Sequence, residues 1–257
     1  MELEGRVAWV TGAAGGIGRA VIRRLAEDGA RIAATDTDAA TLIDAVADLP
    51  GYERHLALAL DVRDAAAVEA AADRIEAELG PITVAVNGAG ILRTGPIAEL
   101  TQETWEEVLR INATGVFLVS RAAARRMAAR GRGSIVTVAS NAAALPRIGM
   151  AAYAASKAAS TIFTKCLGLE LAASGVRCNV VAPGSVETAM QYALWHGPDA
   201  RQKVIDGDPS TYRLGIPLGR LADPEDVAET VAFLAGERSR HITMQDIYVD
   251  GGQSLRA

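Results

Sequence analysis

Residues Val7-Ala-Trp-Val-Thr11-Gly-Ala-Ala-Gly-Gly-Ile-Gly18 join a short apolar run to a glycine-rich turn that leads into a helical pattern. Gly12, Gly16 and Gly18 lack a Cβ, so they permit a tight turn, close approach of a pyrophosphate and close helix–strand contact. The free N–H groups at the start of the helix attract phosphate oxygens. The order strand, glycine turn and helix therefore predicts a dinucleotide-binding loop.

Short runs rich in β-branched residues alternate with helical segments along most of the chain. The predicted strands are Arg6–Val10, Arg31–Thr35, His55–Ala59, Thr83–Asn87, Ser134–Ala139, Arg177–Ala182 and Ile247–Val249. The predicted helices are Gly16–Asp28, Ala39–Asp48, Asp64–Glu78, Thr101–Arg130, Ala152–Ala173 and Pro224–Ala235. Strands that are apolar on both faces and alternate with helices predict a sheet covered on both sides. We expect an α/β fold, a single-domain Rossmann-type doubly wound sheet of seven mostly parallel strands.

One segment, Glu187–Leu221, interrupts this alternation. It shows weak periodicity and contains the turns Gly197-Pro198, Asp208-Pro209 and Ile216-Pro217. A long insertion of this kind inside a compact domain is usually a lid or a binding loop. No repeat or change in composition marks a second domain. We therefore expect one domain over residues 1–257, with a substrate lid at about 187–221.

Composition and charge exclude several classes of protein. The chain has 257 residues, of which 50% are hydrophobic and 22% charged, and its net charge is −5. This balance predicts no affinity for nucleic acid or an anionic membrane surface. The chain has no signal peptide at its start and no run of 18 apolar residues, so we expect a cytoplasmic protein. The cysteines, Cys166 and Cys178, and the scattered histidines match no metal-site pattern; no metal is expected, and both cysteines are predicted to be buried.

Asp36 ends the second predicted strand, about 20 residues after the glycine loop, where such folds bind the adenosine ribose. A carboxylate there accepts hydrogen bonds from both ribose hydroxyls and repels a 2′-phosphate. Neither Thr37 nor the glycine loop supplies a compensating Arg or Lys. We therefore predict NAD rather than NADP as the cofactor. The alternative is an exposed carboxylate that caps the next helix.

Tyr153 and Lys157 lie four residues apart in a predicted helix and therefore project from one face. A nearby ammonium favours the phenolate, so Lys157 is expected to lower the pKa of Tyr153 toward neutrality, where a general base works best. Ser140 follows a predicted strand and so lies at the carboxyl edge of the sheet, where ligands bind in such folds. Without Ser140, the Tyr–Lys pair is equally consistent with a surface pair, and Ser140 itself with a strand-end cap.

Five motifs in order resemble the short-chain dehydrogenase/reductase family over the whole chain. They are the cofactor loop with Gly12, Gly16, Ile17 and Gly18, the adenine-side pair Asp61-Val62, the turn Asn87-Gly-Ala-Gly90, the tetrad Asn112, Ser140, Tyr153 and Lys157, and the turn Pro183-Gly184 before the nicotinamide. The turn at Asn87 departs from the commoner Asn-Asn-Ala-Gly by one glycine. The resemblance also implies a cofactor contact for Thr188.

The resemblance implies a role for each member of the tetrad. Tyr153 exchanges a proton with a substrate oxygen while a hydride moves between substrate and nicotinamide. Lys157 lowers the tyrosine pKa and holds the nicotinamide ribose, Ser140 orients the substrate oxygen, and Asn112 positions a water beside Lys157. Residue type alone leaves Asn112 open as a residue at a helix kink. The competing class is a non-catalytic NAD-binding sensor, because fold does not prove function; no Gly-x-Ser-x-Gly elbow supports a hydrolase.

Further stretches resemble a branch of the family that oxidises the C3 hydroxyl of a carboxylated trans-dihydrodiol to give an aromatic catechol. They are Gly90–Arg93, Pro146–Met150, Gly175–Val181, Leu214–Gly219, His241–Asp246, Met190-Gln191 and Leu194-Trp195. Arg147 is expected to pair with the ring carboxylate of this small-molecule substrate. Its alternative is a surface or inter-subunit salt bridge. Met150, Gln191 and Trp195 are expected to line an apolar pocket under the lid.

Asn141 departs from the aspartate that this branch tends to carry after the serine. A lost negative charge beside the substrate oxygen leaves a second ring substrate open, the 2-amino analogue that is oxidised to 3-hydroxyanthranilate.

The resemblance also implies a homotetramer built on the segments Thr101–Arg130 and Ala152–Ala173. These segments carry more apolar residues than one sheet face needs, namely Val116, Leu118, Val119, Ala123, Ile162, Phe163 and Leu167. Helices that are apolar on more than one side are usually buried on more than one side. The last predicted strand is expected at a second two-fold interface.

Overall fold

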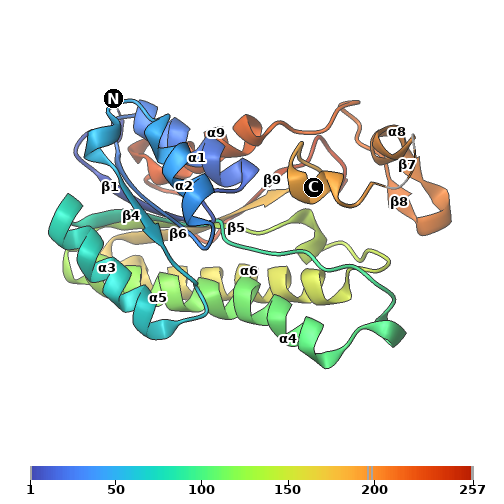
Figure 1. The fold of residues 1–257 in the computed structure, drawn as a ribbon, viewed down its shortest axis with the longest axis horizontal. Coiled ribbons are helices and arrows are strands. Elements are labelled where there is room, and N and C mark those ends of the chain that lie inside the picture. The colour runs from blue at the N-terminus through green and yellow to red at the C-terminus, as the bar shows by residue number, and fades with distance from the viewer. Residues whose placement is uncertain (1, 196, 198, 256–257) are drawn as a thin grey trace.

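A seven-stranded sheet organises the protein, whose computed structural model describes residues 2–195, 197 and 199–255 (Figure 1). The strands follow the order β3-β2-β1-β4-β5-β6-β9, and all six pairings are parallel. Their bounds are β1 Val7–Thr11, β2 Arg31–Asp36, β3 Leu56–Ala59, β4 Ile82–Asn87, β5 Gly133–Val138, β6 Val176–Pro183 and β9 Asp246–Val249. The predicted doubly wound sheet is confirmed, with strand ends within two residues of those expected.

Helices cover both faces of this sheet (Figure 1). One face carries α1 (Gly16–Glu27), α2 (Ala39–Ala47) and α9 (Pro224–Ala235). The other carries α3 (Ala65–Leu79), α4 (Gln102–Leu109), α5 (Val116–Ala129) and α6 (Ala151–Leu171). Because both faces are covered, the central strands β1 and β4 are buried along their whole length.

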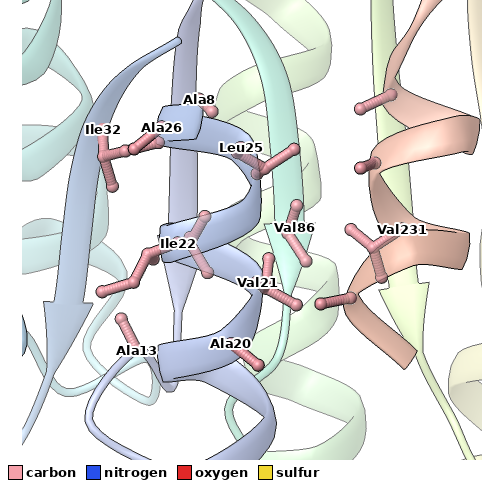
Figure 2. Packing of buried hydrophobic residues seen from close by; sticks show 14 of the residues in the cluster. Ala8, Ala13, Ala20, Val21, Ile22, Leu25, Ala26, Ile32, Val86 and Val231 are labelled. Carbon is pink, nitrogen blue, oxygen red and sulfur yellow. The ribbon is translucent and has the colours of Figure 1, made fainter. Parts of the chain in front are cut away.

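The core on the α1 face follows from the helical spacing of its apolar residues. Ile22 and Leu25 are fully buried, and Val21 is nearly so. Figure 2 shows Val21 of α1 next to Val86 of β4, with Val231 of α9 in the same cluster, so that α1 packs against the sheet and α9 at once. This packing fixes the start of α1 above the carboxyl ends of β1 and β4.

The strand order reverses between β1 and β4, and this is where such sheets bind ligands. Gly12 there adopts a left-handed φ of 69°, and a Cβ on it would lie 2.6 Å from backbone atoms of Gly88. The Thr11 hydroxyl oxygen accepts hydrogen bonds from the N–H groups of Gly88 and Ala89 at 3.2 and 3.3 Å. The glycine loop therefore packs directly on the turn that follows β4.

The predicted helix Thr101–Arg130 is wrong in one respect, because it is not continuous. Between α4 and α5 the backbone forms a π-helix at Arg110–Gly115. Single π-turns inside α-helices are rare and occur often at functional sites. Close packing accompanies this one, since a Cβ on Gly115 would lie 2.6 Å from a Val62 methyl group.

The predicted lid at 187–221 contains short elements that its weak periodicity did not reveal. They are α7 (Ala189–Tyr192), α8 (Ala200–Asp206), β7 (Gly207–Asp208) and β8 (Arg213–Leu214). His196 and Pro198 of this segment, like the ends of the predicted 1–257 domain, lie outside the described residues. Figure 1 places β7, β8 and α8 on the side of the sheet that carries the C-terminal segment.

Cys178 is buried as predicted, whereas Cys166 lies on the outer side of α6 and is exposed, so its predicted burial is wrong. In the described part of the chain, no helix is long and apolar enough to cross a membrane. The same residues contain no cluster of three or more side chains suited to hold a metal ion.

The glycine loop gives a direct test of this packing. A Cβ on Gly18 would lie 2.0 Å from the carbonyl oxygen of Gly12, and neither backbone segment can yield. We expect Gly18→Ala to lower the free energy of unfolding by about 2 kcal/mol or more, measured by chemical denaturation. Gly15→Ala is the matched control, because its nearest neighbour is 3.5 Å away; an equal loss in both variants would contradict the packing described here.

Candidate active site

A cavity of about 100 Å³ opens at the carboxyl ends of β5 and β6. It is lined by nine of the predicted site residues, namely Ile17, Ser140, Arg147, Met150, Tyr153, Pro183, Gly184, Thr188 and Gln191. The structure thus brings the end of the glycine loop, the Ser–Tyr pair and part of the predicted lid to one place. A larger cavity lies at the opposite, amino edge of the sheet and contains none of these residues.

Tyr153 lies in the first turn of α6, and burial raises the pKa of its phenol. A hydrogen bond with the Ser140 side chain and the positive charge of Arg147 oppose this shift. The predicted lowering is therefore wrong for the protein by itself. Lys157 Nζ lies 5.8 Å from the centre of the Tyr153 ring and donates instead to the Val138 carbonyl oxygen at 2.9 Å.

Ser140 lies two residues after the end of β5 and serves two purposes. Its Oγ accepts a hydrogen bond from the Ala142 N–H at 3.1 Å, which caps the short 3₁₀ turn Asn141–Ala143. The same side chain reaches the Tyr153 phenol. The cap that residue type suggested and the predicted position beside the tyrosine are both observed.

Lys157 is buried one helical turn after Tyr153, and burial lowers the pKa of its ammonium to about 8. No carboxylate of the described residues forms a salt bridge with it. Its Nζ lies close to Asn112, since a Cβ placed on Gly90 would be 3.3 Å from both Lys157 Nζ and Asn112 Oδ1. The Lys157 amine thus lies beside polar atoms of Val138 and Asn112.

Asn112 occupies the π-helix between α4 and α5. Its Oδ1 accepts from the Ile91 N–H at 2.8 Å, and its Nδ2 donates to the Ile91 carbonyl oxygen at 2.9 Å and to Ser156 Oγ at 3.0 Å. The side chain therefore ties the irregular turn to the loop after β4 and to α6. The kink that residue type left open as an alternative and the predicted proximity to Lys157 are found together at Asn112.

The start of α1 fits a dinucleotide. Its N-cap, Gly15, provides no side-chain hydrogen bond and its first turn contains no acidic residue, whereas Asp38 and Asp64 cap α2 and α3. The N–H groups of the first turn are therefore left for phosphate oxygens. Gly16 faces the predicted lid, because a Cβ on it would lie 2.9 Å from a Thr188 methyl group.

Asp36 is held by backbone N–H groups at the end of β2. Its carboxylate accepts from Ala14 at 3.1 Å and from Asp38 at 3.2 Å. The alternative of a cap for the next helix is wrong, because the side chain of Asp38 caps α2. Arg19, the first cation after the loop, donates its Nη2 to the Thr41 carbonyl oxygen at 3.0 Å.

Three further predicted residues lie outside the cavity lining. Asp61 forms a salt bridge with Arg63 at 2.6 Å, and Val62 packs in the core on the α3 face. Asn87 is the buried last residue of β4 and donates to Ser120 Oγ at 2.8 Å and to Thr137 Oγ1 at 3.1 Å. These bonds fix the turn on which the glycine loop packs.

Arg147 lies between Ser140 and Tyr153, and its guanidinium faces the cavity. Burial is the main cause that lowers its pKa, to about 10. Its Nη2 donates to Asn141 Oδ1 and to Gln253 Oε1, both at 3.1 Å. It forms no salt bridge within the described part of the chain, so a surface ion pair inside one subunit is not what holds it.

The sequence missed two residues at this site and placed one wrongly. Gln253, from the C-terminal segment, holds Arg147, and Arg213 of β8 lines the cavity. Only the proximity of Arg213 to the matched stretch Leu214–Gly219 hinted at it. Trp195 was predicted in the pocket wall, but it packs against Val204, Ile216 and Leu221 in a small separate core, while its neighbour Leu194 lines the cavity.

Comparisons with known proteins agree with this geometry. A family model described as enoyl-(acyl carrier protein) reductase matches residues 12–254. The chain is 51% identical to the 2,3-dihydro-2,3-dihydroxybenzoate dehydrogenase of Bacillus subtilis (98% of this chain, 97% of the relative). It is 43% identical to the enzyme of the same name from Escherichia coli, with both chains fully covered. A Brucella melitensis 3-ketoacyl-(acyl-carrier-protein) reductase complexed with NADH has the same fold, with a TM-score of 0.90 and 32% identity over 98% of this chain and 99% of that one.

The fold, the cavity at the strand ends and these full-length similarities lead to one assignment. The predicted resemblance is confirmed: the chain belongs to the short-chain dehydrogenase/reductase family of nicotinamide-dependent oxidoreductases.

Proposed function

We propose that this enzyme uses NAD to oxidise the C3 hydroxyl of 2,3-dihydro-2,3-dihydroxybenzoate and so forms the aromatic 2,3-dihydroxybenzoate. The observation that carries the proposal is the cavity that holds the Tyr153 phenol and the Arg147 guanidinium together, with no salt bridge to Arg147 in the described chain. A half-buried cation beside a proton carrier fits a substrate with both a hydroxyl and a carboxylate. The two relatives named for this reaction, at 51% and 43% identity, support the same substrate.

Proton transfer is assigned to Tyr153. Ser140 donates a hydrogen bond that orients the substrate oxygen, and Tyr153 takes the hydroxyl proton. When bound, NAD would accept the hydride and bring a positive charge to the site. That charge would add to the Ser140 hydrogen bond and the Arg147 charge, which already oppose the burial that raises the pKa of Tyr153. Lys157 would hold the nicotinamide ribose. Asn112 would keep a water at the Nζ of Lys157, and this water would pass the proton to solvent.

The cofactor is assigned to the crevice between β1 and β4. Gly12, Gly16 and Gly18 leave room for the pyrophosphate, with Ile17, Thr188, Pro183 and Gly184 on the nicotinamide side. Asp61, Val62 and Asn87 shape the adenine side and the turn beneath it. The Asp36 carboxylate would accept hydrogen bonds from the hydroxyls of the adenosine ribose. It would repel a 2′-phosphate, which favours NAD over NADP. Arg19 is engaged by Thr41 and does not offset this charge.

The amino-substituted substrate rested on Asn141, and the structure gives that residue a different use. Asn141 Nδ2 donates to Gln253 Oε1 at 3.1 Å and to Asp250 Oδ2 at 3.3 Å, and its Oδ1 accepts from Arg147. The side chain supports Arg147, which gives Asn141 a use that does not require a ring amine. Met150 and Gln191 line the same cavity, under residues 187–221 as the lid of a single domain.

The assay of this function compares the carboxylated dihydrodiol with the same diol lacking the carboxylate. We expect a higher kcat/KM for the carboxylated compound, higher with NAD than with NADP, by about tenfold or more in each comparison. Arg147→Ala is expected to raise KM for the carboxylated diol more than it lowers kcat. Equal rates on both diols, or an unchanged Arg147→Ala enzyme, would contradict the proposal; preferred turnover of the 2-amino analogue would establish the alternative substrate.

Tyr153→Phe separates an enzyme from an NAD-binding sensor. The variant keeps the ring but loses the proton carrier, so kcat should fall at least about 100-fold. Binding of NADH, followed by its fluorescence, should persist. Near-normal turnover by this variant would remove Tyr153 from the mechanism.

Lys157 should reduce the stability of the folded chain. Because burial lowers its pKa from 10.5 to about 8, the folded state carries a penalty of roughly 3 kcal/mol below pH 8, and this penalty fades between pH 8 and 10.5. We expect Lys157→Met to raise the free energy of unfolding at pH 7 by about 1–3 kcal/mol, less the lost bond to Val138, while it abolishes turnover.

Lys165→Met on the same helix is the control for this stability gain. Lys165 forms a salt bridge with Asp246 at 2.7 Å, so its loss should not stabilise the protein. A Lys157→Met protein that unfolds more easily than the wild type at pH 7, or a gain that does not shrink toward pH 10.5, would show that burial of this amine is not costly.

We further propose a cytoplasmic homotetramer built on α5 and α6. Four of the residues expected to supply its surface, Val116, Leu118, Val119 and Ala123, are buried inside the subunit, so that part of the expectation is wrong. Phe117, Ile162 and Leu169 are exposed by 39%, 60% and 69%, and they supply an apolar face instead. Light scattering should give the mass of four chains at micromolar concentration; a stable monomer would contradict this assembly.

A further inference from the structure

Arg213 of β8 is a second guanidinium in the cavity that the proposed function leaves unused. Its Nη2 donates to Ser185 Oγ at 2.9 Å. Its Nε is buried and has no hydrogen-bond partner in the described part of the chain. A buried donor without a hydrogen-bond partner destabilises the folded protein. The cost is larger when the donor belongs to a charged group such as a guanidinium.

The two arginines share the same electrostatic environment. Arg147 and Arg213 line the same cavity, and the charge of Arg213 is, after burial, one of the causes that lower the pKa of Arg147. The described residues provide neither of them with a salt bridge. Asp250 is the carboxylate that acts on Arg147, but its oxygens already accept bonds from Asn141, Gly252 and Ser254.

Gln253 and Gln191 complete this arrangement. Gln253 accepts from Arg147 Nη2 at 3.1 Å and donates to the carbonyl oxygen of Leu214, the neighbour of Arg213, at 3.3 Å. It therefore holds the loop that carries Arg147 and the strand that carries Arg213 together. Gln191, which also lines the cavity, has a buried Nε2 without a partner among the described residues.

We propose that Arg213 is a specificity-determining residue and that the ring carboxylate of the substrate bridges Arg147 and Arg213. A carboxylate has two oxygens that can accept bonds from two guanidinium groups at once. Arg147 comes from the loop after β5, whereas Arg213 comes from the lid, so one anion links the lid to the body of the enzyme. This inference rests on the proposed function, because it assigns the carboxylate of that substrate.

The test measures how strongly Arg213→Gln weakens the selection of a carboxylate. The kcat/KM for 2,3-dihydro-2,3-dihydroxybenzoate is divided by that for the diol without the carboxylate. We expect this ratio to fall at least about tenfold in Arg213→Gln, mainly through KM, and less in Arg213→Lys, which keeps the charge but not the fork of donors. The combined Arg147→Ala, Arg213→Gln variant should lose less than the product of the two single losses, because both groups hold one anion.

Arg201→Gln is the matched control, since Arg201 is a lid arginine whose salt bridge with Glu187 lies on the surface. Its ratio should equal that of the wild type. An unchanged ratio in Arg213→Gln, or an equal fall in Arg201→Gln, would overturn the role of Arg213 while leaving the proposed reaction intact.

A binding measurement separates this inference from the reaction itself. Calorimetric titration with 2,3-dihydroxybenzoate and with catechol uses probes that need no turnover. We expect the wild type to prefer the carboxylated probe and Arg213→Gln to lose at least about tenfold of that preference. If the wild type turns over no carboxylated dihydrodiol, the proposed reaction is wrong, but the titration still tests the role of Arg213. An equal preference for 2,3-dihydroxybenzoate over catechol in the wild type and in Arg213→Gln would overturn that role.

Discussion

Desolvation of cationic side chains at the carboxyl edge of the sheet is the constraint on which this site depends. Lys157 is buried and Arg147 and Arg213 are half-buried, and burial is the largest cause that lowers the pKa of each. No carboxylate in the described chain forms a salt bridge with them, so the folded protein bears a cost that anionic or polar ligands relieve. The same burial raises the pKa of Tyr153 and leaves the final adjustment to the bound cofactor.

Segments of irregular backbone hold the side chains of this site in place, and the regular sheet supports these segments. The π-helix at Arg110–Gly115 presents Asn112 to the loop after β4, where both of its amide atoms bind Ile91. Buried polar networks of this kind specify one arrangement when every member is satisfied. The C-terminal segment does the same for Arg147 through Gln253, a residue 106 positions further along the chain.

Local patterns in the sequence were enough to predict the strands, the glycine loop and the Ser–Tyr–Lys arrangement, because each depends on residues near one another in the chain. Residue type left a kink at Asn112 open, but the π-helix at Arg110–Gly115 was not predictable, since Val62 and Ile91, which contact it, come from elsewhere in the chain. Trp195 was assigned to the pocket wall and not to its small separate core for the same reason. The predicted lowering of the Tyr153 pKa was wrong, because the spacing of Tyr153 and Lys157 shows that a charge is near. It does not show how far the phenol is withdrawn from water.

A crystal structure of the complex with NADH and 2,3-dihydroxybenzoate would show whether the substrate binds in this cavity as proposed. We expect the C3 oxygen of the ring to lie within hydrogen-bond distance of the Tyr153 phenol and Ser140, and the carboxylate to contact the Arg147 guanidinium inside the cavity. A ring bound with its carboxylate turned away from Arg147 toward solvent, or with its C3 oxygen out of reach of Tyr153, would contradict this expectation.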